Sequence, residues 1–273
     1  MLDHVAALAD NSTRFAAAIE STVDAAGTPS TAATVPACPD WSAADLAWHL
    51  TEVQYVWAVM TGDRLSAYTE LTPLERPADA DLLPLFHHWS GRLGEVLTAR
   101  DPSETCWSWH PEGGTVAWVR RRQAQEALIH RVDAEQTLAG TGGPGVGPID
   151  EELAADGIDE ILRVMLDVDP VPAWGRFEPD GSTVRLVTRS QRWDMELGRL
   201  IGTDDDGNDR DLGAVRMEEA GDRTPDATLR GSAGAIDLWL WRRRGLDSGP
   251  GGELEVDGDR GVVERLADLA AID

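Results

Sequence analysis

Apolar residues recur at helical spacing through the first half of the chain. Four segments carry an apolar stripe with steps of three and four residues: residues 2–26, 42–61, 79–100 and 115–139. This pattern is typical of helices that bury one face. Ser42, followed three residues later by Asp45, predicts a capping box at the start of the second segment. Four amphipathic helices in succession predict an N-terminal four-helix bundle.

The pattern changes after the glycine- and proline-rich run at residues 140–148. Three short segments then alternate apolar and polar positions as strands do: residues 183–188, 193–197 and 227–231. One more strand and three helices complete the prediction: residues 254–256 for the strand, and 150–168, 232–244 and 262–272 for the helices. The acidic run at residues 202–211 is interpreted as a solvated loop.

This order of elements predicts an α+β fold in two domains. Residues 1–141 are expected to form the four-helix bundle, and residues 150–273 a smaller α+β domain. The turns between the predicted strands are too short for crossover connections, so we expect an antiparallel sheet in the second domain.

Every basic side chain of the sequence is an arginine. The chain holds 24 basic and 49 acidic side chains, for a formal net charge of −25, and it contains no lysine. Without an amine side chain, Schiff-base catalysis, pyridoxal-phosphate attachment and P-loop phosphate binding are excluded. The acidic excess repels nucleic-acid phosphates and anionic lipid headgroups, so we expect neither nucleic acid nor membrane as a partner.

No targeting signal is evident in the sequence. The N-terminal residues lack the basic head and apolar core of a signal peptide, and there is no apolar run long enough to span a membrane. A cytoplasmic protein is therefore expected, with Cys38 and Cys106 reduced. Two cysteines cannot form a thiolate zinc knuckle, so any metal site must use histidine and carboxylate ligands.

Three polar residues fall on apolar helix faces and are candidate metal ligands. Glu126 and His130 lie on the inward arc of the segment 115–139, four residues apart, which is the spacing at which one helix can offer two ligands to one ion. His49 lies in the middle of the apolar face of the segment 42–61. A set of two histidines and one glutamate leaves one position of zinc open, and an open position is typical of a catalytic metal.

The same residues also fit a site without metal. A single inward histidine is more often a hydrogen-bonded core residue, and a buried Glu–His pair explains the pattern about as well as a metal does. Asp45 and Asp133, each one turn from a candidate histidine, are candidates to orient the rings. A helix cap for Asp45 and an arginine pair for Asp133 are the simpler interpretations.

Three motifs resemble one known family. CPDWSAADLAWHL at residues 38–50 and RRRQAQEALIHRVDAE at residues 120–135 are similar to helix motifs of the mycothiol-dependent maleylpyruvate isomerase family, whose N-terminal domain is a DinB-like metal-binding bundle. LRGSAGAIDLWLWRRR at residues 229–244, followed by LEVDGD, resembles the second domain of that family, an α+β unit related to sterol-carrier proteins. The resemblance spans nearly the whole chain.

The resemblance implies a metal and a thiol cofactor. A divalent metal, usually zinc, would be held by His49, Glu126 and His130, and mycothiol would take the open position. Its thiolate would add to a small electrophile, giving an isomerisation or an S-transfer. A monomer or homodimer is expected, and the arginine-only composition fits the GC-rich coding of the actinobacteria that make mycothiol.

Two further residues are candidate contacts for the cofactor or the substrate. The family pattern has Gly before a single Arg at the end of the tryptophan-rich helix. Arg243 takes the place of that Arg. A basic last helical turn is the simpler interpretation of this arginine. Trp57, two turns beyond His49 on its face, is expected to line the cavity.

Two other functions remain open at this point. The first is a small-molecule binding or resistance protein that keeps the bundle, with or without the metal, and performs no turnover. The second is a metal hydrolase that activates water at the same open position.

Overall fold

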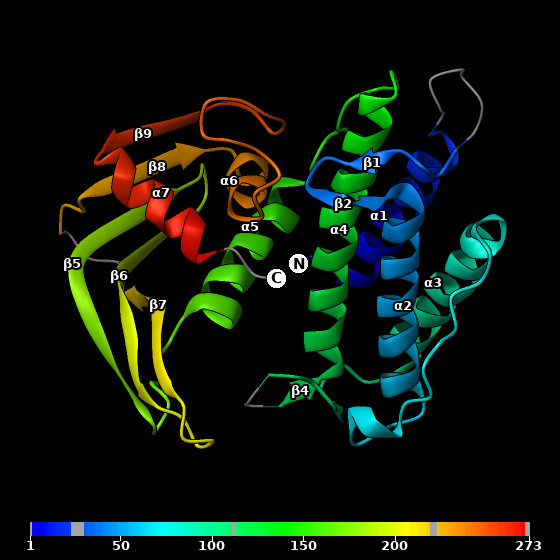
Figure 1. Cartoon of the computed structure of the whole chain (residues 1–273), viewed down its shortest axis with the longest axis horizontal. Helices are drawn as coiled ribbons and strands as arrows, with labels where there is room; N and C mark the ends of the chain where they lie inside the picture. Colours follow the sequence, from blue (N-terminus) through cyan, green and yellow to red (C-terminus); the bar gives the residue numbers. More distant parts are fainter. Residues whose placement is uncertain (1, 23–29, 111–112, 219–222, 271–273) are drawn as a thin grey trace. The chain divides into compact units, whose positions relative to one another are not determined.

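The fold is built from two structural units. The computed structural model describes residues 2–22, 30–110, 113–218 and 223–270. The chain divides into Met1–Gly147 and Pro148–Asp273 (Figure 1). No helix in these described ranges is long and apolar enough to cross a membrane.

The first unit is a helical bundle, as the apolar stripes predicted. Its helices are α1 (His4–Glu20), α2 (Ala43–Gly62), α3 (Leu82–Ala99) and α4 (Val116–Gly140), with short 3₁₀ helices η1 (Tyr68–Glu70) and η2 (Asp79–Asp81) between α2 and α3. α1 packs mainly on α4, and α2 on α3. Their apolar faces share a core that includes Phe15, Leu46, Phe86 and Ala134. The first helix ends at Glu20, earlier than expected, and positions 23–26 of that prediction lie outside the described residues.

Two short β ribbons, which the sequence did not predict, lead into α2 and α4. β1 (Thr34–Val35) pairs with β2 (Cys38–Ser42), and β3 (Thr105–Cys106) with β4 (Gly114–Thr115), both antiparallel. β2 runs directly into α2, and β4 directly into α4. Both helix starts are also capped. Ser42 and Asp45 form the predicted capping box, and the Thr115 hydroxyl accepts a hydrogen bond from the backbone N–H of Trp118.

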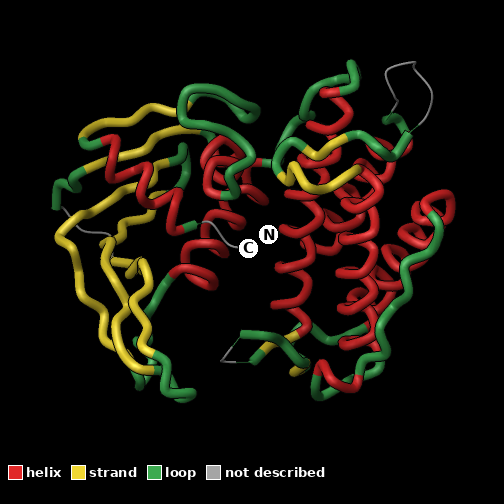
Figure 2. Tube along the Cα trace, in the orientation of Figure 1, coloured by secondary structure: helices red, strands yellow, loops and turns green. Residues whose placement is uncertain are grey.

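The second unit is a five-stranded sheet with helices on one face (Figures 1 and 2). Its elements are α5 (Glu151–Glu160), the π-helical turn η3 (Ile161–Leu166), β5 (Gly175–Val187), β6 (Arg192–Thr203), β7 (Asp209–Glu218), β8 (Ala227–Gly231), α6 (Ala233–Leu240), β9 (Leu254–Gly258) and α7 (Arg260–Leu269). The strand order is β7-β6-β5-β8-β9. Trp193, Met195 and Leu197 project from one face of β6 into a core shared with the helices.

The α+β class is confirmed, and the antiparallel sheet needs a correction because the sheet is mixed. β5 pairs in parallel with β8, whereas the other neighbouring strands pair antiparallel. The register explains this. Glu218, the last residue of β7, pairs with Asp194 of β6, which in turn pairs with Arg185 of β5. Ala227, the first residue of β8, pairs with the neighbouring Val184 of β5. The end of β7 and the start of β8 therefore lie at nearly the same level along the sheet. β8 runs in the same direction as β7, and for this reason it is parallel to β5.

Other segments differ from the prediction in their length. The acidic loop expected at residues 202–211 is shorter, because β6 continues to Thr203 and β7 begins at Asp209. The helix expected at residues 150–168 ends as α5 at Glu160 and continues as the wider turn η3. Positions 271–272 of the last predicted helix lie outside the described residues.

Candidate metal centre

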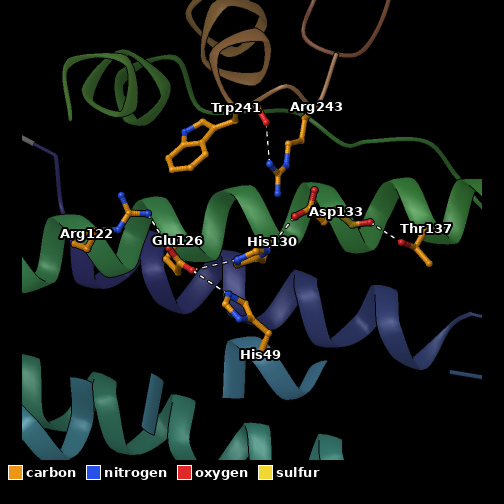
Figure 3. Close-up of polar contacts among 8 residues, drawn as sticks. All are labelled: His49, Arg122, Glu126, His130, Asp133, Thr137, Trp241 and Arg243. Atoms are coloured by element: carbon orange, nitrogen blue, oxygen red, sulfur yellow. Dashed lines mark hydrogen bonds and ion pairs between the residues drawn. The ribbon is translucent and has the colours of Figure 1, made fainter. Parts of the chain in front are cut away.

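α2 and α4 bring the three candidate ligands together. One ligand atom each from His49, Glu126 and His130 lies within 4.8 Å of the others. Oε1 of Glu126 is 3.1 Å from Nε2 of His130 and 3.5 Å from Nε2 of His49 (Figure 3). The two imidazole rings meet edge to face, with 4.7 Å between their centroids. The side chain of His49 is 33% exposed, whereas Glu126 is 19% and His130 10% exposed. The cluster is therefore open on the His49 side.

The ring of His130 is fixed from behind by Asp133. Oδ2 of Asp133, whose side chain is fully buried, lies 2.9 Å from Nδ1 of His130. Asp133 accepts a hydrogen bond from Nδ1–H, so Nε2 is the nitrogen that faces Glu126. Histidines that bind metals commonly donate their other ring N–H to a carboxylate in this way.

The two oxygens of Glu126 have different partners. Oε2 accepts a hydrogen bond from Nη2 of Arg122 at 2.8 Å, while Oε1 faces the two histidines (Figure 3). Arg122 is itself buried and lies one helical turn before Glu126. The arginine therefore leaves one carboxylate oxygen directed at the cluster. Sequence reasoning did not assign this role to Arg122, although its spacing of four residues from Glu126 is the available signal.

Electrostatics within the cluster favour charged groups. Burial alone would raise the pKa of Glu126, but hydrogen bonds with His130 and His49 and the charge of Arg122 hold that pKa well below its usual value. Burial would lower the pKa of His130, but the hydrogen bonds with Asp133 and Glu126 outweigh it and raise that pKa to about 9. Hydrogen bonds thus involve the same atoms that a metal would contact.

The donor set fits a divalent metal. Ligand atoms about 2.0–2.1 Å from a tetrahedral zinc ion lie about 3.3 Å from one another. The two Oε1–Nε2 distances of 3.1 and 3.5 Å lie on either side of this value. Two imidazole nitrogens and one carboxylate oxygen are ligands that zinc accepts, and a set of three leaves a position for a further ligand.

Other sequence candidates lie in different surroundings. Asp45 caps α2, accepting from the backbone and hydroxyl of Ser42 at 2.9 and 2.7 Å, and it also pairs with Arg76. Trp57 is buried, and its ring contacts Trp107 and Trp118. The ring of Trp41, which sequence reasoning missed, also lies beside His49, with 4.9 Å between the centroids.

Arg243 belongs to the second unit and remains a predicted contact. Its Nη1 donates to the backbone carbonyl of Trp241 at 2.8 Å (Figure 3). The neighbouring Arg244 has a structural role, since its guanidinium donates to the carbonyls of Gly245, Pro250 and Gly252.

Known proteins resemble this chain both in sequence and in fold. Residues 6–135 match the family model described as the mycothiol maleylpyruvate isomerase N-terminal domain. Two solved structures, of the mycothiol-dependent maleylpyruvate isomerase and of a mutant of it, are similar over 91% of this chain and 94% of theirs, each with a TM-score of 0.54. Their sequences are 14% and 13% identical to this one, so the likeness shows the fold. No curated protein matches the sequence.

Proposed function

We propose that this chain is a divalent-metal-dependent enzyme that acts with a low-molecular-weight thiol on a small electrophile. Residues 6–135 belong to the mycothiol maleylpyruvate isomerase N-terminal domain family, which supports this proposal. Zinc is the expected metal and mycothiol the expected thiol, in an isomerisation or an S-transfer. The observation that carries the proposal is the three-ligand cluster, with its ligand atoms within 4.8 Å of one another and one side open.

The chain contributes position and charge to this chemistry. A divalent metal at the cluster would lower the pKa of a thiol ligand, so that thiolate is present near neutral pH. His49 and His130 would hold the metal through Nε2, and Glu126 through Oε1. Asp133 keeps the proton of His130 on Nδ1. The partly exposed face at His49 is where the thiol and the electrophile would enter.

The first experiment measures metal content. The full chain, His49→Ala and the control His88→Ala would be loaded with zinc, desalted and analysed by elemental mass spectrometry. His88 lies exposed on α3, outside the cluster. We expect about one zinc per chain in the wild type and in the control, and a large loss in His49→Ala, because two ligands hold zinc much less tightly than three. Unchanged metal in His49→Ala would overturn the site assignment.

The second experiment separates the functions. Calorimetric titration of the zinc-loaded protein with mycothiol should show binding that His49→Ala loses. Mycothiol-dependent conversion of a series of unsaturated model electrophiles should exceed one turnover per chain, with thiol consumed in an S-transfer, or with isomer formed and thiol regenerated in an isomerisation. Stoichiometric binding without turnover would indicate the binding or resistance protein. Hydrolysis of test esters without added thiol would indicate the metal hydrolase.

Arg243 is our proposed contact for an acidic group of the substrate or the thiol. Its replacement by Met keeps much of the length of the side chain and removes the charge. We expect Arg243→Met to raise KM for an acidic electrophile while zinc content stays unchanged. An unchanged KM for both substrate and thiol would remove Arg243 from the site.

A further inference from the structure

Five aromatic rings form a continuous arc in the N-terminal unit. Named in order of contact, they are Tyr68, Trp107, Trp57, Trp118 and Trp109. Successive ring centroids are 5.7, 5.6, 5.6 and 5.3 Å apart. The rings come from four separate segments: η1, the loop between β3 and β4, α2 and α4. We call this set the aromatic arc.

The aromatic arc lies along the same two helices as the metal ligands. On α2, Trp57 follows His49 by eight residues, and on α4, Trp118 precedes Glu126 by eight residues. The Trp57 and Trp118 rings meet at 5.6 Å, and His49 meets Glu126 at 3.5 Å, so α2 and α4 run antiparallel between the two pairs. Eight residues of helix correspond to a separation of about 12 Å.

Exposure increases from the middle of the aromatic arc to its ends. Trp57 is buried, Trp107 and Trp118 are half-buried, and the end rings Tyr68 and Trp109 are 54% and 48% exposed. In the described part of the chain, these two rings and Leu212 are the exposed large apolar side chains. Tyr68 contacts Trp107, and Trp109 lies two residues beyond Trp107, so both exposed rings adjoin the loop between β3 and β4. Exposed apolar groups beside one loop commonly mark a binding surface.

The exposed area suits a small ligand better than a protein. An aromatic side chain buries about 150–250 Å² when it is fully covered, so two half-exposed rings offer roughly 200 Å². A stable dimer needs about 800 Å² from each partner. A planar aromatic group of two or three rings, in contrast, can be covered by an area of this size, and it can stack on or meet the edges of the tryptophan rings.

We propose that the aromatic arc is a subsite for a planar aromatic group carried by the electrophile, an inference that rests on the proposed function. The two-turn separation sets the shape of this substrate. A spacer or a conjugated chain must join its aromatic group to the reacting carbon. The aromatic arc lies about 12 Å from the metal ligands along the helices, and the spacer covers the part of this distance that the metal-bound thiol does not span. The subsite thus favours extended aromatic electrophiles over compact ones.

Binding to the full chain tests the subsite without catalysis. Calorimetry would compare 2-naphthylmethanol with its saturated counterpart, decahydro-2-naphthylmethanol, on zinc-loaded and on chelator-treated protein. We expect the aromatic probe to bind about tenfold more tightly than the saturated one, with or without zinc, because ring–ring contacts add to simple burial. The double variant Tyr68→Ala/Trp109→Ala should lose this preference, while Leu212→Ala, an equally exposed apolar residue of the second unit, should keep it.

Turnover and oligomeric state complete the test. With zinc and mycothiol, the wild type should prefer a naphthyl-bearing unsaturated ketone to its decahydronaphthyl analogue in kcat/KM, and the double variant should not. Equal affinity for both probes, or an unchanged preference in the double variant, would overturn the subsite. The subsite would also be overturned if sedimentation showed a dimer for the wild type and a monomer for the double variant, because the rings would then join two copies of the chain. A chain that prefers the aromatic probe but shows no mycothiol-dependent turnover would overturn the proposed function and leave the subsite standing.

Discussion

Asp133 and His130 form a buried pair that sets the direction in which the histidine faces. Oδ2 of Asp133 lies 2.9 Å from Nδ1 of His130, on the side of the ring opposite Glu126. The carboxylate fixes both the tautomer and the rotation of the ring, so Nε2 is presented to the metal site before any metal arrives.

Replacing Asp133 by Asn should weaken metal binding without removing a ligand. The amide has the same shape but no charge, so the ring of His130 becomes less basic and less firmly oriented. Loss of such a supporting carboxylate typically costs 10–100-fold in metal affinity. Competition with a chromophoric chelator at pH 7.5 would measure the zinc dissociation constant of Asp133→Asn, and we expect a rise of about tenfold or more.

Asp45→Asn is the matched control for this measurement. Asp45 lies four residues before His49, but its carboxylate caps α2 and pairs with Arg76. Zinc affinity should therefore stay at the wild-type value in this variant. An equal loss in both variants would mean that carboxylates act through overall charge rather than through contact with the ring.

The capping box of α2 should make stability depend on pH in the acid range. Hydrogen bonds from Ser42, and then the ion pair with Arg76, lower the pKa of Asp45 to about 2 from its usual value near 3.8. A lowered pKa means that the folded state favours the carboxylate. The stabilisation is present above pH 4 and is lost as the pH falls from about 4 to about 2.

The comparison of wild type with Asp45→Asn isolates this effect. Asp45 is partly exposed, so solvent screening limits the expected loss of unfolding free energy at pH 7 to about 0.5–1 kcal/mol. Urea unfolding at a series of pH values should show that difference shrinking to nothing near pH 2. A constant difference across the range would show that the carboxylate contributes through its shape alone.

Arg242 is strained by its backbone conformation, and replacing it by Gly should stabilise the protein. It follows Trp241, the C-cap of α6, and has a φ of 60°, in the left-handed region. The backbone N–H groups of Arg242 and Arg243 donate to the carbonyls of Trp239 and Leu238. This is the Schellman arrangement, whose left-handed residue is usually glycine. We expect Arg242→Gly to raise the unfolding free energy by about 1 kcal/mol.

Arg242→Ala separates backbone strain from charge in the same measurement. Alanine removes the same charge but keeps the Cβ atom, so chemical unfolding of this variant should show no comparable gain. An equal gain in both variants would attribute the effect to charge.

Sequence periodicity predicted the parts of the site that lie on regular helices. His49, Glu126 and His130 share directions with apolar neighbours, and a helix of 3.6 residues per turn carries that pattern directly into space. The sequence left open whether His49 and Glu126 would meet, because that depends on how α2 and α4 pack. Spacing made Asp133 a candidate to orient His130 and also gave the signal for Arg122, but the partner that each side chain takes depends on its rotamer.

The sequence predicted the strand lengths and the pairing of the sheet less well than it predicted the helices. Pro179, Asp180 and Gly181 look like a turn, yet they lie within β5, where the pairing with β6 shifts its register. The predicted strand therefore began at residue 183 and missed the first half of β5. Parallel pairing of β5 with β8 depends on where β7 ends, and that position follows from the true strand lengths. Three of the four ribbon strands, β1, β3 and β4, have only two residues each and are too short to show an alternation.

The thiol of Cys106 should be unreactive, which separates it from the chemistry proposed for the bound thiol. Burial, followed by the charge of Glu104, raises the pKa of Cys106 to about 11. The thiolate is the reactive form, so at pH 8 this side chain should react on the order of 100-fold more slowly with iodoacetamide than free cysteine does. Peptide mass spectrometry would follow its labelling in the native and the urea-unfolded protein. Cys106→Ala should leave thiol consumption with mycothiol unchanged. Loss of turnover in this variant, together with fast labelling of the native thiol, would make Cys106 the nucleophile and displace the metal-activated thiol from the mechanism.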